Sequence, residues 1–191
     1  LLFQIAPHCK RYVGTDISDS SLGYVKKQLA NQQLASQVTL QLAAADNFKD
    51  VKPGSYDTVI LNSVLQYFPN IGYLVNVLER AVRSIKPGGA LFIGDVRNYC
   101  LQEAFATSIE LFNAPDDLSI QELRQRIQKR INQEEELTVD PSFFLALQKH
   151  LPQISQVQIL LKQSRFHNEL TQFRYDVVLH VGSTPQAMLE T

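Results

Sequence analysis

The sequence has few cysteines, little net charge and no long apolar run, and each shortage excludes a class of protein. Its two cysteines, Cys9 and Cys100, are too few for a disulfide framework and lack metal-motif spacing, so a reduced, cytoplasmic compartment and no metal are expected. The 18 basic and 19 acidic residues nearly cancel, which leaves no electrostatic case for nucleic acid or an anionic membrane as partner. No segment is apolar for long enough to cross a bilayer, and we find no signal peptide or repeat. One globular domain remains, since a hydrophobic content of 45% is enough to build a core.

Short apolar strands alternate with amphipathic helices in the first half of the chain. Strands are predicted over residues 11–15, 37–42, 56–61 and 90–96, and the last two are apolar nearly throughout. The helix between those two is expected to stop at the sequence KPGG, residues 86–89, because proline and glycine end helical patterns. This alternation predicts an α/β fold with a parallel sheet and right-handed crossovers.

A helical segment, residues 101–151, follows and is expected to form a lid over the sheet. Its second helix opens with a capping box, Ser119–Glu122. Two strands, residues 157–161 and 173–181, then close the chain and should pair antiparallel, because the connection between them is short. Residues 183–191 are predicted to be a tail.

Polar residues follow the carboxyl ends of the predicted strands. They are Asp16, Asp46, Asn62, Asp95 and the loop 165–169. Ligands of open α/β sheets bind outside the carboxyl ends of the strands, so this distribution favours a ligand site at that edge. Asp16 is placed to accept hydrogen bonds from ribose hydroxyls, although an acid there also suits a helix cap. Asp46 or the adjacent Asn47 would face an adenine edge, the alternative being an ordinary turn residue.

Six segments share one family pattern: GTDIS, AADNF, VILNSVLQYFP, IKPGGALFIGDVR, EEELTVDPSFF and HNELTQFRYDVVLHV. Together, over residues 1–182, they resemble the S-adenosylmethionine-dependent methyltransferase domains embedded in nonribosomal peptide synthetases and hybrid polyketide synthases. The resemblance implies a Rossmann-like class I sheet, mostly parallel with an antiparallel last strand, and S-adenosyl-L-methionine as cofactor. The residues expected to hold this cofactor are Asp16, Ile17, Ala45, Asp46, Asn47, Asn62 and Ser63.

One part of the family pattern is absent from the sequence. The family's first strand and its glycine-rich GxGxG loop would lie just before LLFQIAP, residues 1–7. In the family this strand lies in the middle of the sheet, between the strands that end here at Asp16 and Asn62. We therefore expect the natural protein to be longer and the fragment alone to bind cofactor poorly.

Methyl transfer to an amine requires the amine to be neutral, and the loop before the last strand contains the candidate bases. His167 is the first choice, because its ordinary pKa suits proton transfer near neutrality, although a surface-loop histidine is at least as common. Glu169 would orient the amine or act as the base, unless it is simply an exposed carboxylate. Asn168 would hold a substrate carbonyl. Tyr175 would offer a hydroxyl, with core packing nearly as plausible.

Four further residues are candidates for binding the substrate. Gln66 is expected near the transferred methyl group, the alternative being a helix-capping residue. Tyr67 would line the pocket, with core packing as the alternative. Asp95 and Arg97 would either bind substrate or form an ion pair with each other.

The second helix of the lid is locally basic, with Arg124, Arg126, Lys129 and Arg130. These side chains would dock an acidic carrier protein or its phosphopantetheine arm. A solvated helix face offset by the run Glu134–Glu136 is the favoured reading from sequence alone.

The leading functional hypothesis is N-methylation of an aminoacyl or peptidyl group tethered to a carrier protein, next to neighbouring synthetase domains. O- or C-methylation of a tethered polyketide intermediate is the nearest alternative. A catalytically silent scaffold domain is a second, and the missing glycine loop supports it. A nicotinamide-dependent oxidoreductase shares an acid such as Asp16 but lacks the expected Tyr-x-x-x-Lys pair.

Overall fold

The chain is divided into two compact units, Leu1–Lys49 and Asp50–Thr191, which are called unit 1 and unit 2 below. The structure, a computed structural model, describes residues 1–30, 34, 36–163 and 165–182. The predicted tail, residues 183–191, lies outside the described residues. Among the described residues, none of the helices has the length and apolar character that crossing a membrane requires.

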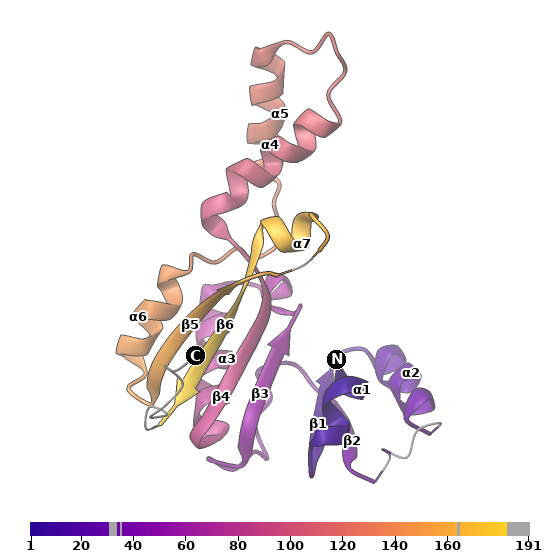
Figure 1. The fold of residues 1–191 in the computed structure, drawn as a ribbon, viewed down its shortest axis with the longest axis vertical. Coiled ribbons are helices and arrows are strands. Elements are labelled where there is room, and N and C mark those ends of the chain that lie inside the picture. The colour runs from indigo at the N-terminus through magenta and orange to yellow at the C-terminus, as the bar shows by residue number, and fades with distance from the viewer. Residues whose placement is uncertain (31–33, 35, 164, 183–191) are drawn as a thin grey trace. The chain divides into compact units, whose positions relative to one another are not determined.

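Unit 1 is built on two parallel strands (Figure 1). Strand β1 pairs with strand β2 in register from Tyr12↔Val38 to Asp16↔Leu42. Both strands were predicted, and each boundary agrees to within one residue. The elements of unit 1, in order, are α1 (Leu2–Ile5), η1 (Ala6–His8), β1 (Tyr12–Asp16), α2 (Asp19–Ala30) and β2 (Val38–Leu42).

Unit 2 is built on a four-stranded sheet with the order β3-β4-β6-β5. Strands β3 (Tyr56–Asn62) and β4 (Ile85–Arg97) pair in parallel. Strand β6 (Arg174–Val181) pairs antiparallel with both β4 and β5 (Ile154–Leu161), which confirms the predicted antiparallel ending of the sheet. Because β6 alone runs against the others, the carboxyl ends of β3, β4 and β5 meet the start of β6 at one edge.

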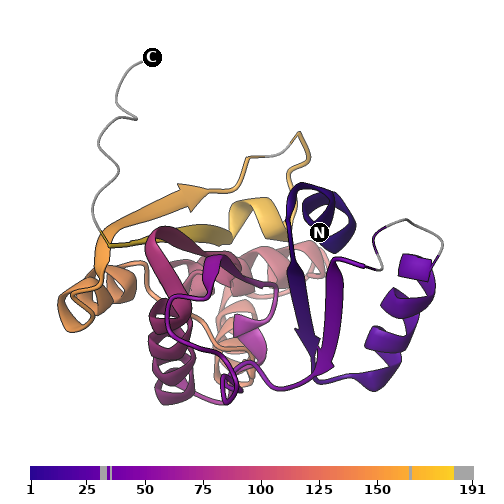
Figure 2. The same cartoon turned by 90° about the horizontal axis from the view of Figure 1, so that it is seen from below.

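Two helices supply the core of unit 2. Helix α3 (Ile71–Ser84) fully buries the stripe of Leu74, Val77, Leu78 and Ala81, whose spacing puts these side chains on one face. Helix α6 (Ser142–His150) packs beside β5. Figures 1 and 2 show both helices on the same face of the sheet. Strand β6 buries every second residue, as expected for a strand covered mainly on one face.

The helix was expected to stop at KPGG, and α3 does end directly before this sequence, with Ile85 as its C-cap residue. Helix α3 stops at Ser84, and residues 86–89 belong to β4. The pairing passes from Tyr56↔Ile85 to Thr58↔Ala90, so five steps along β4 match two along β3 and the extra residues form an irregularity. Gly88 has φ 86°, a conformation that glycine adopts without strain. The sequence KPGG therefore follows the end of the helix as expected, but it forms the irregular start of β4 and not a separate turn.

The helical segment after β4 contains α4 (Gln102–Phe112), α5 (Ile120–Asn132) and α6, with the short η3 (Tyr99–Leu101) before them. Ser119 and Glu122 form the predicted capping box. Helices α4 and α5 contact each other and extend away from the end of the sheet (Figure 1). Whether this segment acts as a lid stays a prediction.

Residues 134–139, called the strap, lie along the edge of the sheet where β4 ends. The Leu137 amide donates to the Gln66 carbonyl at 2.8 Å, and the Val139 amide donates to the Arg97 carbonyl at 2.9 Å. The buried Tyr175 hydroxyl donates to the Val139 carbonyl at 3.0 Å. The strap thus fixes the connection between the helices and the edge of the sheet.

Candidate functional site

Unit 1 brings together the polar residues that follow its two strands. Because β1 and β2 are parallel and Asp16 pairs with Leu42, Asp16 and residues 45–47 lie at the same end of the two strands. The Ala43 amide donates to the Asp16 carbonyl at 2.9 Å, which ties the two ends together. Beside Asp16, the apolar side chain of Ile17 is 77% exposed.

The Asp16 carboxylate helps the chain turn from β1 into α2. Its Oδ1 accepts a hydrogen bond from the Ser18 amide at 2.7 Å, and the Ser18 hydroxyl accepts one from the Ser21 amide at 3.2 Å. The alternative role of Asp16, at the start of the helix, is therefore observed in part: Asp16 binds the Ser18 amide, and the Ser18 hydroxyl caps the helix. An exposed carboxylate has about four lone-pair sites, so one bond to Ser18 leaves it able to accept others.

The turn after β2 is held by its own backbone. The Asn47 amide donates to the Ala44 carbonyl at 3.0 Å, and the Phe48 amide donates to the Asp46 carbonyl at 3.1 Å. The Asn47 side-chain oxygen accepts weakly from the Lys49 amide at 3.4 Å. Asn47 therefore has a role in the turn, and binding of an adenine edge by Asp46 or Asn47 stays a prediction.

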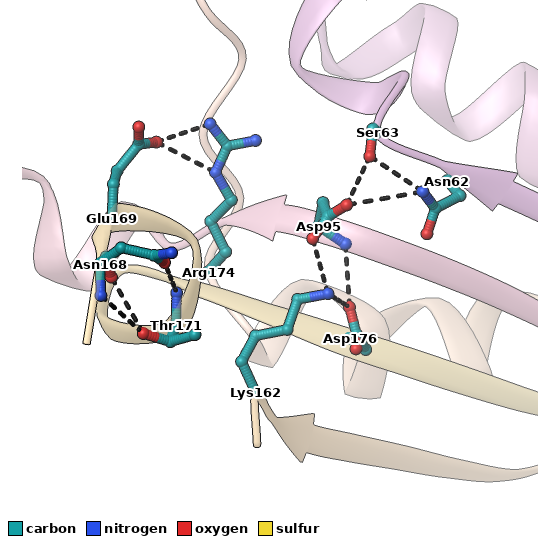
Figure 3. Close-up of polar contacts among 9 residues, drawn as sticks. All are labelled: Asn62, Ser63, Asp95, Lys162, Asn168, Glu169, Thr171, Arg174 and Asp176. Carbon is teal, nitrogen blue, oxygen red and sulfur yellow. Dashed lines mark hydrogen bonds and ion pairs between the residues drawn. The ribbon is translucent and has the colours of Figure 1, made fainter. Parts of the chain in front are cut away.

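In unit 2, five polar side chains from four strand ends meet at one edge of the sheet (Figure 3). We call them the edge cluster: Asn62, Ser63, Asp95, Lys162 and Asp176. The Ser63 hydroxyl donates to the Asp95 carboxylate, and the Asn62 amide donates to the Ser63 oxygen at 2.9 Å. Lys162 bridges the two carboxylates, with Nζ 2.6 Å from Asp95 and 2.7 Å from Asp176. The Asp95 amide also donates to Asp176 at 2.9 Å.

The backbone at the edge cluster is strained. Ser63 has φ 56° and Asp95 has φ 62°, and both lie in the left-handed region that L-residues seldom adopt. At Gly94 an added Cβ would collide with the Asn62 side chain, so only glycine leaves room for that amide. Residues held in such conformations cluster at functional sites, which makes this edge the strongest candidate in unit 2.

The edge cluster carries two carboxylates and one ammonium, so its formal charge is negative. Burial alone would raise the pKa of Asp95, but the hydrogen bonds from Lys162 and Ser63 outweigh it and lower that pKa. Burial alone would lower the pKa of Lys162, but its bonds to Asp176 and Asp95 raise it. Both groups are therefore charged at neutral pH, and the cluster suits a cationic or hydrogen-bond-donating ligand.

The predicted pairing of Asp95 with Arg97 was wrong. In a regular strand, residues two apart point to the same face, but Asp95 has φ 62° and the pairing of β4 with β6 shifts between Ile93 and Val96, so the regular alternation is broken here. Arg97 turns to the strap, where its guanidinium lies 2.8 Å from Glu134 and 2.9 Å from Glu136. It also lies over the Phe105 ring, 4.9 Å from the centroid. Burial alone would lower the pKa of Arg97, but the two glutamates raise it. Arg97 thus holds the strap and α4 at the edge of the sheet.

The loop before β6 uses most of its predicted catalytic groups locally (Figure 3). The Asn168 side chain accepts from the Thr171 amide at 3.2 Å and caps the short helix α7 (Glu169–Gln172). Glu169 accepts two hydrogen bonds from Arg174, at 2.6 and 3.1 Å. His167 is exposed.

Tyr175 fits the packing alternative. It is buried, its hydroxyl bonds the strap, and burial raises its pKa far above the ordinary value. A hydroxyl in this state neither ionises near neutrality nor reaches solvent, so it links β6 to the strap.

The two predicted substrate residues after β3 are very different in exposure. Tyr67 is 73% exposed, whereas Gln66 is only 5% exposed. Both lie in η2 (Leu65–Tyr67), directly after the strained turn at Ser63. Among the described residues, the Gln66 Oε1 atom has no hydrogen-bond partner. A buried acceptor without a donor is costly, so this atom is one that a ligand would satisfy.

Sequence reasoning missed Lys162 and Asp176. Lys162 follows β5 directly, so the rule that polar residues gather after strands already applied to it. Asp176 is an acid within FRYDVVLHV, a segment that is otherwise mostly apolar, which is itself a signal. In the part of the chain that the structure describes, no group of three or more His, Cys, Asp or Glu side chains is placed to hold a metal ion.

Comparisons with known proteins show which family has sequences similar to this chain. Residues 1–91 match the model of a methyltransferase domain. The chain is 46% identical over 186 residues to chondramide synthase cmdD of Chondromyces crocatus, covering 97% of this chain and 5% of that protein. It is 37% identical over 185 residues to the nonribosomal peptide synthetase agiA of Aspergillus flavus, covering 95% and 2%. The chain thus spans a small part of the length of these relatives.

The fold is also found in solved structures. One is that of the N-methyltransferase NodS from Bradyrhizobium japonicum in complex with S-adenosyl-L-homocysteine, with a TM-score of 0.60. The likeness covers 94% of this chain and 71% of that one at 13% sequence identity, so it shows a shared fold. The Rossmann-like α/β fold predicted from the sequence is confirmed.

Proposed function

We propose that this chain, a methyltransferase domain with nonribosomal peptide synthetases among its relatives, N-methylates a carrier-tethered aminoacyl or peptidyl group. S-Adenosyl-L-methionine is the proposed cofactor, which supplies an activated methyl group when bound. The carrier protein and the neighbouring synthetase domains are its proposed partners.

The residues of unit 1 suit the nucleoside part of this cofactor. Asp16 keeps acceptor capacity for two ribose hydroxyls after its bond to Ser18, and it stands at the end of a parallel strand, where such acids bind ribose. The exposed Ile17 offers an apolar surface for the face of an adenine ring. Ala45, Asp46 and Asn47 are at the same end of the strands and are assigned to the adenine edge. The side chains at this end of β1 and β2 therefore fit the adenosine part of S-adenosyl-L-methionine.

The Gln66 Oε1 atom is the single observation that carries the amine assignment. It is a buried acceptor without a donor among the described residues, and an amine brings N–H donors. A carbanion that is to be methylated brings none, so this observation favours nitrogen over carbon as the methyl acceptor. A hydroxyl group also donates, which keeps O-methylation as the competing outcome.

The edge cluster supports the same assignment by its charge. Asp95 and Asp176 share one lysine, so the cluster attracts an ammonium group. A free α-amino group titrates near pH ~8 and must lose a proton before it attacks. We assign that proton to His167 or to solvent water, because Glu169, the other predicted base, is engaged in its pair with Arg174. The protein's main contribution is to position the amine and to exclude water.

Mass spectrometry of a small substrate tests this function directly. The full-length protein is incubated with S-adenosyl-L-methionine carrying a deuterated methyl group and with S-alanyl-pantetheine. We expect a mass increase of one labelled methyl group, which fragment ions place on the alanine nitrogen. A label on oxygen or carbon would overturn the amine assignment. No transfer from a protein that nevertheless binds S-adenosyl-L-homocysteine would indicate a catalytically silent scaffold.

A further inference from the structure

A concave surface lies between helix α4 and the second half of helix α5. It is lined by Glu110, Arg126, Lys129, Arg130, Gln133 and Glu134, and we call it the basic pocket. Every residue of α5 is at least partly exposed, so the cations of this helix face solvent and not the core. Arg124, on the same helix, does not line the pocket. Three of the four cations of α5 therefore line a concave surface, which an ordinary solvated helix face does not provide.

The acids of the basic pocket already have cationic partners. Glu110 pairs with Arg130 at 2.5 Å, and Glu134 pairs with Arg97 at 2.8 Å. Arg126 also lies close enough to the exposed Glu122 to help Ser119 lower the pKa of that glutamate. Lys129 adds a further positive charge, so the lining retains positive charge. Helix α5 holds four of the 18 basic residues of the chain and one of its 19 acidic residues.

The basic pocket is joined to the edge cluster by a short path within unit 2. Glu134 lines the pocket and pairs with Arg97, and Arg97 is two residues beyond Asp95 of the edge cluster. The pocket is thus connected through Glu134 and Arg97 to β4, the strand that also carries Asp95. A substrate with an anion at one end and an amine at the other, joined by a flexible arm, matches this arrangement.

We propose that the basic pocket binds the phosphate of a phosphopantetheine arm whose aminoacyl end reaches the edge cluster. This inference rests on the proposed function, which supplies the tethered aminoacyl group. The arginine fork matches the phosphate oxygens in shape and charge, and lysine adds a strong point charge. The phosphate would be recognised at Arg126, Lys129 and Arg130, while the uncharged arm needs no specific partner.

A set of three substrates isolates the phosphate. They are S-alanyl-pantetheine, which has no phosphate, S-alanyl-4′-phosphopantetheine, and a purified carrier domain that bears the alanyl-phosphopantetheine arm. For the wild-type full-length protein, we expect the phosphate to lower KM by about tenfold, the effect of one charge-assisted hydrogen bond. Arg126→Gln/Lys129→Gln should raise KM for the phosphorylated substrate to the value for pantetheine and leave the pantetheine reaction unchanged.

Arg124→Gln is the matched control, since it removes a cation from the same helix outside the basic pocket. It should keep the preference for phosphate. Equal KM values for the two small substrates in the wild type would overturn the inference and leave the proposed function standing. So would a preference that appears only with the carrier domain, since that would mean recognition of a protein surface. If the wild type methylates none of the three substrates, the proposed function itself fails.

Discussion

Replacing Gln66 with methionine should stabilise the protein and impair methyl transfer. The Gln66 Oε1 atom is buried without a donor among the described residues, so its removal relieves a penalty of about 1–3 kcal/mol. For a protein of this size that free energy corresponds to a rise of a few degrees, roughly 2–4 °C per kcal/mol, in Tm. If the same atom holds the amine, kcat/KM for S-alanyl-pantetheine should fall by about tenfold to a hundredfold.

The opposite signs of the two effects make this substitution informative. A core residue with only a structural role would not lose activity while it gains stability. Gln148→Met is the matched control, because the Gln148 amide donates to the Ser155 carbonyl at 3.0 Å near the start of β5, away from the edge cluster. The control should lower Tm and leave kcat/KM unchanged. Unchanged activity in Gln66→Met would remove Gln66 from the substrate site, and a fall in its Tm would mean that Oε1 has a partner.

Replacing Arg97 with methionine should cause the largest loss of stability. The side chain is 8% exposed, and its loss leaves Glu134 and Glu136 facing each other without a cation. Breaking a fully buried pair costs about 3–5 kcal/mol, and because the glutamates are partly exposed we expect about 2–3 kcal/mol. Urea denaturation measures this difference in the free energy of unfolding. The strap should loosen with it, so hydrogen exchange at the Val139 amide should accelerate.

Two further variants separate charge from packing at Arg97. Adding Glu134→Gln and Glu136→Gln to Arg97→Met should recover much of the lost stability, because the unpaired carboxylates are then gone. Lys86→Met is the control for an exposed pair, since Lys86 and Asp57 are 48% and 86% exposed and such pairs contribute about 0–1 kcal/mol. If Arg97→Met costs no more than Lys86→Met, the strap is held by its backbone bonds alone.

Local rules predicted the elements whose causes are local. The capping box at Ser119 and Glu122 depends on residues three apart, and the sequence shows it directly. The antiparallel pairing of β5 and β6 follows from the short connection between them. The KPGG motif correctly marked the end of α3, but the sequence did not show that residues 86–89 continue as an irregular strand, because that depends on the pairing with β3.

The partners within the candidate site could not be predicted from sequence, because they are distant along the chain. Asp95 meets Lys162 and Ser63, and Arg97 meets glutamates beyond α5, although Asp95 and Arg97 are themselves close in sequence. The rule that polar residues gather after strand ends identified the edge of the sheet, but it did not identify the hydrogen-bond or ion-pair partner of each side chain. Asp16 shows a second limit, since one carboxylate can stabilise a turn and keep acceptor capacity for a ligand.

Titration of S-adenosyl-L-homocysteine into the full-length protein tests the central claim most directly, namely that the chain binds an adenosine-bearing methyl donor. Calorimetry should show saturable binding by the wild type. Asp16→Asn should weaken it by about tenfold or more at unchanged Tm, because an amide still accepts from the Ser18 amide but presents only one acceptor oxygen to the ribose. Absence of binding by the wild type would contradict the claim, and full affinity in Asp16→Asn would reduce Asp16 to a residue of the turn.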